Sequence, residues 1–408
     1  MPDRKTITDF LRSHVLRREE VDAFLDPQAP HWARFDAELG YVLHDCTVQD
    51  GMDGSYTIGA YLSTGERRVI NYAELPCRLS CFGDSFTMCH QVSDSETWEE
   101  YLAGHLGEPV RNYGVGGYGV YQAYLRLKRV VYQGRGTAYM LLNVFGMDDH
   151  FRSLDAWRRP RCGDWFQTNP PMLFHANPWN HVRFNLTTGE LEERASLCPT
   201  PESLYQLCDE AWVLDTFHND VALQMHLGCT GQYEVETAQM RRLADVLGAP
   251  FDAAAGAEAV RELQRVAGLK ATMGIIEWAC AFCAGEAIQL RVMLTHGYPE
   301  LYGALSGWPR PDRELVDWLR ERDRLIFDVA DSHIEDIRDF NITVERYLQR
   351  LMIGHYNPAG NHFLAYALKD AMVDWLDPKP RTYPHKGETL RFDGHLLGLD
   401  NPGRVTSA

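Results

Sequence analysis

The segment 138–146, with the sequence AYMLLNVFG, is an almost unbroken apolar run. Such a run is typical of a central strand in a parallel sheet, because that strand is buried on both faces. Other short strand-like runs recur along the chain, and helical stretches separate several of them. These runs are residues 78–82, 109–115, 288–295 and 324–330. Alternating strands and helices predict a parallel sheet with right-handed crossovers and helices on both faces.

Apolar spacing predicts the helices that accompany these strands. They are expected at residues 96–107, 118–133, 312–323 and 360–376. In the last of them, apolar side chains recur every four residues and form a strip that can pack on a sheet.

The alternation is interrupted between residues 160 and 285. This span begins as an aromatic-rich loop and continues with helical stretches such as 256–269. We predict a mostly helical insertion that covers the core as a possible lid. The full organisation is then an N-terminal extension (1–75), a first core part (76–159), the insertion (160–285), a second core part (286–380) and a C-terminal tail (381–408).

The charge and composition of the chain exclude several classes of function. A formal net charge of −17 argues against a protein that tracks nucleic-acid phosphates or adsorbs to an anionic membrane. No run of 18 uninterrupted apolar residues is present, and the N-terminus is too charged for a signal peptide. The ten cysteines follow no regular framework, so we expect reduced thiols and a cytoplasmic protein.

Polar and glycine-rich segments follow three of the predicted strands. Ser85 follows the first strand, residues 114–117 follow the second, and residues 146–149 follow the third. Ligands of parallel sheets bind at the carboxyl ends of the strands. We therefore expect these segments to meet at one edge of the sheet.

Four ordered segments of the chain resemble the blocks of the SGNH (GDSL-type) hydrolases, which are serine esterases and acyl transferases. They are FGDSFT (82–87), NYGVGGYG (112–119), GMDD (146–149) and GHYNPAGNHF (354–363). The resemblance covers residues 78–150 and 285–376. It implies an α/β fold of the flavodoxin-like, three-layer α/β/α SGNH type, with no metal and no cofactor.

The resemblance also assigns roles to individual residues. Ser85 matches the nucleophile, His355 the general base and Gly117 the glycine that binds the oxyanion. A serine hydroxyl needs a hydrogen-bonded base to take its proton, and a neutral histidine can supply that base. Asp84 is expected to brace the turn before Ser85 through backbone N–H groups. Asp149 is a further candidate for the site.

The third block departs from the family pattern. Asp148 stands where the family has an asparagine, and an ionised carboxylate accepts hydrogen bonds but cannot donate one to an oxyanion. Asp148 would have to be protonated, which needs a strongly raised pKa. Otherwise this donor is missing, or Asn143 or another side chain replaces it.

The last block departs as well. Met352 stands where the family usually has an aspartate that orients the histidine, and the next two residues are not acidic either. A backbone carbonyl could orient His355, as could a carboxylate from elsewhere. Asp149, Asp328 and Asp331 are the candidates for that carboxylate.

The expected function is a serine esterase that acts on a small acyl ester through an acyl-enzyme. The alternatives are an acyltransferase that uses the same intermediate and a binding protein on a catalytically decayed hydrolase fold. No nucleic-acid or membrane partner is expected, and the sequence does not indicate an oligomeric state.

Overall fold

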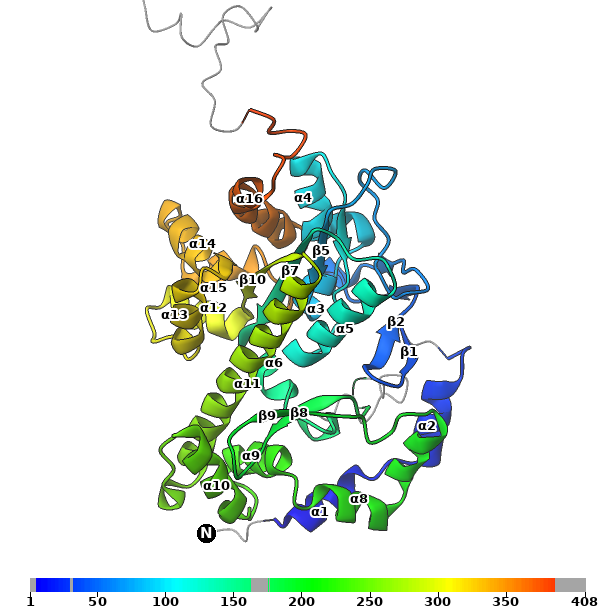
Figure 1. Cartoon of the computed structure of the whole chain (residues 1–408), viewed down its shortest axis with the longest axis vertical. Helices are drawn as coiled ribbons and strands as arrows, with labels where there is room; N and C mark the ends of the chain where they lie inside the picture. Colours follow the sequence, from blue (N-terminus) through cyan, green and yellow to red (C-terminus); the bar gives the residue numbers. More distant parts are fainter. Residues whose placement is uncertain (1–4, 30–31, 163–174, 176, 386–408) are drawn as a thin grey trace, which may run out of the picture.

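The computed structural model describes residues 5–29, 32–162, 175 and 177–385. A parallel sheet lies at its centre (Figure 1). It has five strands in the order β11-β10-β7-β5-β6. The strands are β5 (Leu79–Phe82), β6 (Val110–Asn112), β7 (Tyr139–Phe145), β10 (Gln289–Thr295) and β11 (Leu325–Asp328). Each strand falls within one of the predicted runs, so the prediction of an α/β protein with a parallel sheet is confirmed.

Helices cover both faces of the sheet. Strand β7 shows why: Leu141 belongs to one apolar cluster, and its neighbours Met140 and Leu142 belong to the other. The helices of the first cluster are α4 (Trp98–Leu106), α12 (Tyr298–Leu305), α14 (Val329–Asp336), α15 (Val344–Gln349) and α16 (Pro358–Trp375). The helices of the second include α5 (Val120–Tyr132), α11 (Ala257–Gly285) and α13 (Arg313–Glu321). This arrangement is compatible with a three-layer α/β/α fold.

Strand β5 lies between β6 and β7. The chain leaves β5 toward β6 on one side and then crosses to β7 on the other side. Parallel sheets bind ligands at such a switch in strand order, just beyond the carboxyl ends of the strands. The short helix α3 (Ser85–Met88) begins there, and α6 (Gly146–Arg152) follows β7 directly.

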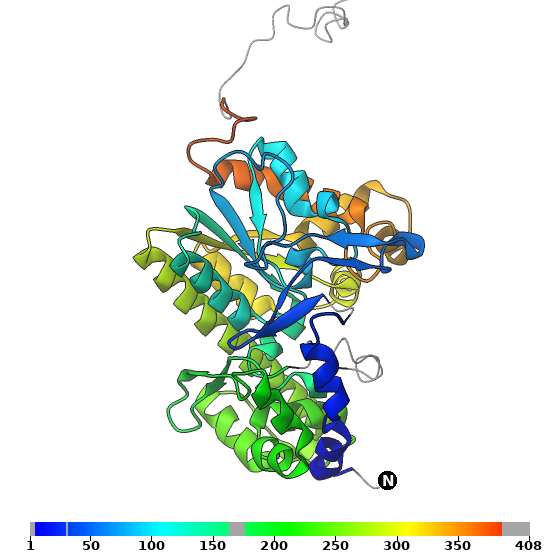
Figure 2. The same ribbon diagram turned by 90° about the vertical axis from the view of Figure 1, so that its right-hand side faces the viewer.

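A second lobe lies beside the sheet and contains most of the insertion (Figure 2). Its described elements are a hairpin, three helices and the first part of α11. They are β8 (His181–Phe184), β9 (Leu191–Arg194), α8 (Glu210–Phe217), α9 (Val221–Thr230) and α10 (Thr237–Leu247). The two short sheets of the N-terminal extension are β1 (Ala33–Asp36) with β2 (Gly40–Leu43), and β3 (Cys46–Val48) with β4 (Thr57–Gly59).

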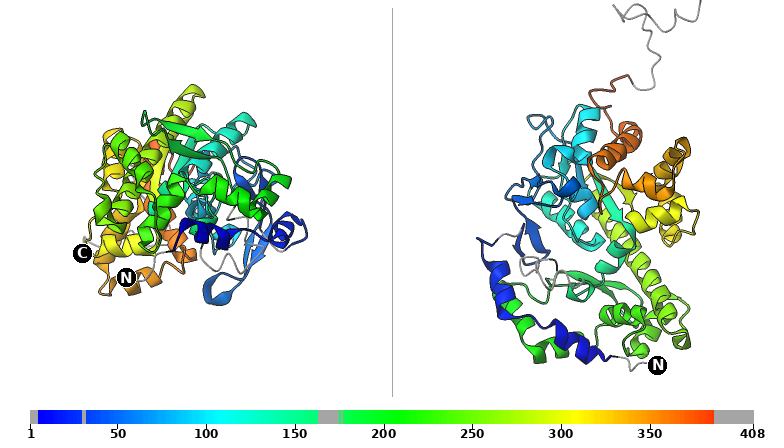
Figure 3. Two further views of the ribbon diagram at one scale, coloured as in Figure 1. Left: turned by 90° about the horizontal axis from the view of Figure 1, so that it is seen from below. Right: turned by 180° about the vertical axis from the view of Figure 1, so that it is seen from behind.

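The first helices of the chain pack on this lobe. Helix α1 (Ile7–His14) lies beside α8, and α2 (Arg18–Leu25) follows it (Figure 3). Arg12 pairs with Glu210 at 2.8 Å, and the N–H of Leu16 donates to the carbonyl of Leu207. The N-terminal helices therefore pack against the segment 202–217. Residues 386–408 of the predicted tail lie outside the described residues.

Helix α11 joins the two lobes. It extends well beyond the predicted stretch 256–269, because the residues that follow are apolar and contain no proline. Its early residues contact α9 and α10, and later residues contact α5, α6 and β10. Among the described helices it is the one long and apolar enough to cross a membrane, yet 56% of its apolar window is buried inside the protein. Burial of this kind is also typical of a core helix.

Candidate active site

Ser85 is the first residue of α3, immediately beyond the carboxyl end of β5. Asp84 caps the helix: its Oδ1 accepts the N–H of Phe86 at 2.9 Å. The turn requires glycine at position 83, because a Cβ there would lie 2.2 Å from Oγ1 of Thr87. This tight turn holds Ser85 at the switch in strand order.

His355 lies between α15 and α16, in a turn that the preceding residues shape. The N–H of Ile353 donates to the His355 carbonyl at 2.9 Å, and Gly354 has a φ of 123°, which favours glycine. Asn357 then caps α16 by accepting the N–H of Gly360. The result is that His355 Nε2 lies 2.8 Å from Ser85 Oγ.

Gln91 holds the other side of the imidazole. Its Oε1 accepts the N–H of His355 at 2.9 Å and lies 3.1 Å from His355 Nδ1. Its Nε2 donates to the carbonyl of Asp50 at 3.0 Å, which fixes the orientation of the amide. Because an amide oxygen only accepts, Nδ1 carries the proton and the lone pair of Nε2 faces Ser85.

The surroundings of His355 favour its neutral form. Burial lowers the pKa of His355 well below its ordinary value, and the nearby His90 and Arg152 lower it further. The ring of His90 stacks on that of His355 with centroids 4.9 Å apart. His90 also pairs with Asp50 at 2.9 Å and meets the edge of Trp32. A neutral imidazole beside a serine can accept the serine proton.

Asp84 and Asp149 are both buried near Ser85. Burial raises the pKa of Asp84 to about 6. Burial and the neighbouring Asp84 also raise the pKa of Asp149, which accepts the N–H of Phe145 at 3.1 Å and pairs with Arg152 at 3.0 Å. The Ser85 hydroxyl lies 3.3 Å from Asp84 Oδ2, farther than from His355. Asp84 therefore caps α3, and Asp149 binds the end of β7 and Arg152 at the edge of the site.

Asp148 does not fit the oxyanion-binding role that its position in the third block suggests. Its side chain is 63% exposed and pairs with Arg152 at 3.0 Å. The charge of Arg152 lowers the pKa of Asp148 below its ordinary value. An ionised carboxylate has no proton to donate, so we leave Asp148 out of the groups that could bind an oxyanion.

The glycine-rich turn after β6 packs directly on α3. A Cβ on Gly114 would lie 2.1 Å from the backbone nitrogen of Met88, and one on Gly116 would lie 3.7 Å from the Cβ of Ser85. Gly117 has a φ of +87° and borders Arg158. The hydroxyl of Tyr41 donates to the carbonyl of Gly116 at 2.6 Å. The turn thus brings backbone next to Ser85, and residue 41 of the extension holds it in place.

The other predicted donors and carboxylates have different partners. The side-chain amide of Asn143 donates a hydrogen bond to Thr87 and accepts one from Thr295. Asp328 binds His296 and Arg310, and Asp331 pairs with Arg320 at 2.8 Å. Asp149 binds Arg152. The group on His355 Nδ1 is therefore Gln91, a residue that the sequence reasoning did not single out.

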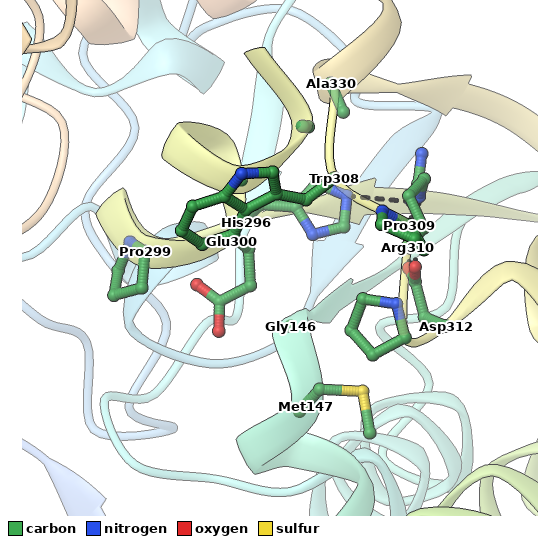
Figure 4. Close-up of a pocket in the computed structure, with 13 residues that line it drawn as sticks. Gly146, Met147, His296, Pro299, Glu300, Trp308, Pro309, Arg310, Asp312 and Ala330 are labelled. Carbon is green, nitrogen blue, oxygen red and sulfur yellow. Dashed lines mark hydrogen bonds and ion pairs between the residues drawn. The ribbon is translucent and has the colours of Figure 1, made fainter. Parts of the chain in front are cut away.

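A separate cavity of about 220 Å³ lies at the carboxyl ends of β7, β10 and β11 (Figure 4). Met147, Glu300 and Trp308 contribute to its wall, and His296 and Arg310 close one side. Ser85 and His355 are not among its lining residues. Within the described ranges, no group of three or more His, Cys, Asp or Glu side chains is arranged to hold a metal ion.

Comparisons with known proteins add little to this geometry. No protein-family model matches the chain, and no curated protein matches it significantly. Over 56% of its length the chain is similar to 78% of a solved structure from Desulfitobacterium hafniense DCB-2, which is assigned to the G-D-S-L family of lipolytic proteins. The two are 12% identical with a TM-score of 0.18. A likeness at this level establishes neither a shared fold nor a shared function.

Proposed function

We propose that the protein is a serine esterase of the SGNH type that acts on small acyl esters through an acyl-enzyme. The observation that carries this proposal is the 2.8 Å contact between Ser85 Oγ and His355 Nε2, two residues that lie 270 positions apart in the chain. A nucleophile in contact with an oriented base is the arrangement that covalent acyl transfer requires.

In the proposed reaction, Ser85 Oγ attacks the ester carbonyl carbon and His355 Nε2 takes the hydroxyl proton. Collapse of the tetrahedral intermediate expels the alcohol, to which His355 returns the proton. Water then attacks the acyl-enzyme with His355 again as the base, releasing the acid and regenerating Ser85. Each proton that leaves Ser85 or water passes through the same imidazole nitrogen.

The backbone N–H groups of Ser85 and Gly117 are the proposed donors to the oxyanion. The N–H of Gly116 already donates to Met88 Sδ at 3.3 Å, which supports the choice of Gly117 over Gly116 as the donor. Oxyanion donors are each worth about 100- to 1000-fold in rate. With Asp148 ionised, this site relies on backbone groups where the family adds an asparagine side chain.

Gln91 is the proposed third member of the catalytic group. It fixes the imidazole tautomer as a carboxylate would, but it adds no negative charge to stabilise the imidazolium that forms. Ser85 and His355 would thus carry out the proton transfer, and the neutral Gln91 would only orient the imidazole.

A fluorophosphonate probe tests the proposal. We expect it to label the wild-type protein and to fail with Ser85→Ala, and short-chain 4-nitrophenyl esters should show the same pattern. Ser80→Ala is a matched control, because Ser80 is fully buried in β5. Failure of the probe and of the esters with folded wild-type protein would reject the esterase and favour a binding protein on a decayed fold.

Acyl transfer to an acceptor other than water is the second candidate. It is favoured by residues of the extension that lie beside the site, where Trp32 meets His90 and Tyr41 binds the Gly116 carbonyl, because limited access of water protects an acyl-enzyme. Added alcohols or amines should then divert the acyl group into a new ester or amide. A product mixture that contains only free acid at high acceptor concentration would leave hydrolysis as the reaction.

A further inference from the structure

Arg158 is a buried cation that has no acidic partner among the described residues. Arg158 is only 8% exposed, and within the described part of the chain no carboxylate lies within 4.0 Å of its guanidinium. Its neighbours in sequence differ: Arg159 pairs with Glu20, and Arg161 pairs with Asp155. A buried charge is costly unless an opposite charge or strong hydrogen bonds compensate it.

The described groups that contact Arg158 are neutral. Its Nη1 donates to Nδ1 of His175 at 3.1 Å and to the carbonyl of the same residue at 3.4 Å. The guanidinium also lies over the ring of Trp179 at 5.9 Å. Because His175 accepts through Nδ1, it is uncharged at that nitrogen. These contacts position the guanidinium but do not neutralise it.

The chain makes room for this guanidinium at the glycine-rich turn. A Cβ on Gly117 would lie 2.1 Å from Nη1 of Arg158, so any other residue at position 117 would displace the arginine. Gly116, one residue earlier, is the glycine that approaches Ser85. Arg158 therefore lies beside the same short turn as the nucleophile.

Aromatic rings connect Arg158 to the other side of the site. The ring of His175 lies 5.8 Å from that of Trp32, and Trp32 lies 4.5 Å from His90. His90 in turn stacks on His355. Arg158, His175, Trp32 and His90 thus form a row of contacts that leads to His355, and the positive charge of Arg158 lies at one end of this row.

Arg152, near the same turn, provides a useful contrast. It donates to the carbonyl of Tyr118 at 3.4 Å, but it also pairs with the carboxyl groups of Asp148 and Asp149. The guanidinium of Arg152 therefore has acidic partners within the protein. Arg158 differs, because it has no such ion pair among the described residues.

We propose that Arg158 binds an anionic group of the substrate, such as a carboxylate, phosphate or sulfate, carried near the ester that Ser85 attacks. This inference rests on the proposed esterase function and specifies its substrate class. A guanidinium suits such groups because its planar donors match their oxygens in a bidentate geometry. The anion supplies the compensation that the protein does not.

Two pairs of isosteric esters test the proposal. 3-Acetoxybenzoate and 3-acetoxybenzamide differ by one charge in the alcohol part, and monophenyl adipate and its terminal amide differ by one charge in the acyl part. We expect the charged member of at least one pair to have a kcat/KM about tenfold or more above that of its amide. Arg158→Met should abolish this preference, and Arg158→Lys should retain part of it.

Arg126→Met is the matched control. Arg126 is also buried and also lacks an acidic partner among the described residues, but it lies over Tyr113 and donates to the carbonyl of Thr64, away from Ser85. Its substitution should leave the charge preference unchanged. If Arg158→Met does not fold, protection by inorganic phosphate serves instead: phosphate should slow fluorophosphonate labelling of the wild type and have less effect on Arg158→Lys.

The outcomes separate this inference from the esterase proposal. Suppose that the wild-type protein is labelled but does not prefer the charged ester in either pair. This result would overturn the role of Arg158 and leave the esterase proposal intact. Equal losses for charged and neutral esters in Arg158→Met would also overturn it, since they indicate a role in the oxyanion or in folding. Absence of labelling in the wild type would instead overturn the esterase itself.

Discussion

Two histidines lie at the carboxyl edge of the same sheet, and their partners differ. His355 lies between the hydroxyl of Ser85 and the amide oxygen of Gln91, which are both neutral. His296, after β10, lies 3.2 Å from Asp328 Oδ1 and 3.2 Å from Arg310. One imidazole presents a lone pair to a hydroxyl, and the other belongs to a network of charges.

The difference separates a reactive site from a structural one. Around His296, Arg310 binds both Asp328 and Asp312, so each charge has an opposite partner. Such a network fixes the ends of β10 and β11 and leaves no base available. Around His355 the local groups keep the imidazole neutral and direct one nitrogen at Ser85. The predictions below test this contrast.

The largest effect is expected from removal of the two imidazoles in turn. His355→Ala should lower ester hydrolysis about 1,000-fold or more, because Ser85 loses its base. His296→Ala should keep the rate within about threefold of the wild type and lower the melting temperature. Steady-state kinetics and thermal melts of both variants check this. Comparable losses of rate in the two variants would remove the distinction.

The next effect concerns Gln91 and has a defined sign in pH. Gln91→Ala should lower kcat/KM about 100-fold, because the imidazole is no longer held in position. Gln91→Glu should keep activity but raise the pKa of His355, since a carboxylate favours the imidazolium. His355 acts as a base when neutral, so the acidic limb of the pH–rate profile should move to higher pH. An unchanged profile in Gln91→Glu would argue against contact between residue 91 and the base.

A third prediction addresses stability at the structural histidine. Burial alone would raise the pKa of Asp328, but the hydrogen bond with His296 and the charge of Arg310 outweigh it and lower the pKa to about 2. A depressed pKa stabilises the folded state above the unfolded value of about 4, and this contribution disappears as the pH falls toward 2. Asp328→Asn should therefore cost about 2 kcal/mol at pH 7 and much less near pH 2.

Urea denaturation across this pH range measures the loss. Asp331→Asn is the control, because Asp331 pairs with Arg320 on the surface with more than half of each side chain exposed. Its substitution should change the free energy of unfolding by about 0.5 kcal/mol or less. A cost for Asp328→Asn that does not decline with pH would place its origin in packing rather than in ionisation.

The smallest effect is expected at Asp148. Asp148→Asn should keep ester turnover within about threefold of the wild type, because the side chain is largely exposed and Arg152 retains Asp149 as a partner. Kinetics with a neutral ester provide the measurement. A loss of more than about 100-fold, the scale of an oxyanion donor, would show that Asp148 acts in the reaction.

The sheet could be predicted because its signals are local. The apolar run at 138–146 and its four counterparts each contain enough β-forming residues to identify a strand, and alternation with helices fixes a parallel arrangement. The length of α11 was underestimated because its apolar residues continue without the stripe that marks an amphipathic helix. Gly268 lies within it, where the ring of Phe151 occupies the space of a side chain.

The partners of the site residues were harder to predict. The order of the blocks predicts that Ser85 and His355 lie close together. Gln91 is one of many polar residues, and no sequence pattern distinguishes it. Its contact depends on the turn at Gly354 and on the Asp50 carbonyl, and both require the folded chain. Arg158 is similar, because the groups that lie beside its guanidinium are set by the folded chain and not by its neighbours in sequence.

Helix α11 has a consequence for how a ligand reaches Ser85. Its 29 residues span about 43 Å without a break, from the insertion to the sheet. Midway along it, Thr272 binds His150 of α6 at 2.8 Å, next to the carboxylates that border Ser85. A rotation of the second lobe would have to bend this helix or separate it from α6. The lobe should therefore act as a stationary wall, and exchange of reactant and product should depend on loop movements instead.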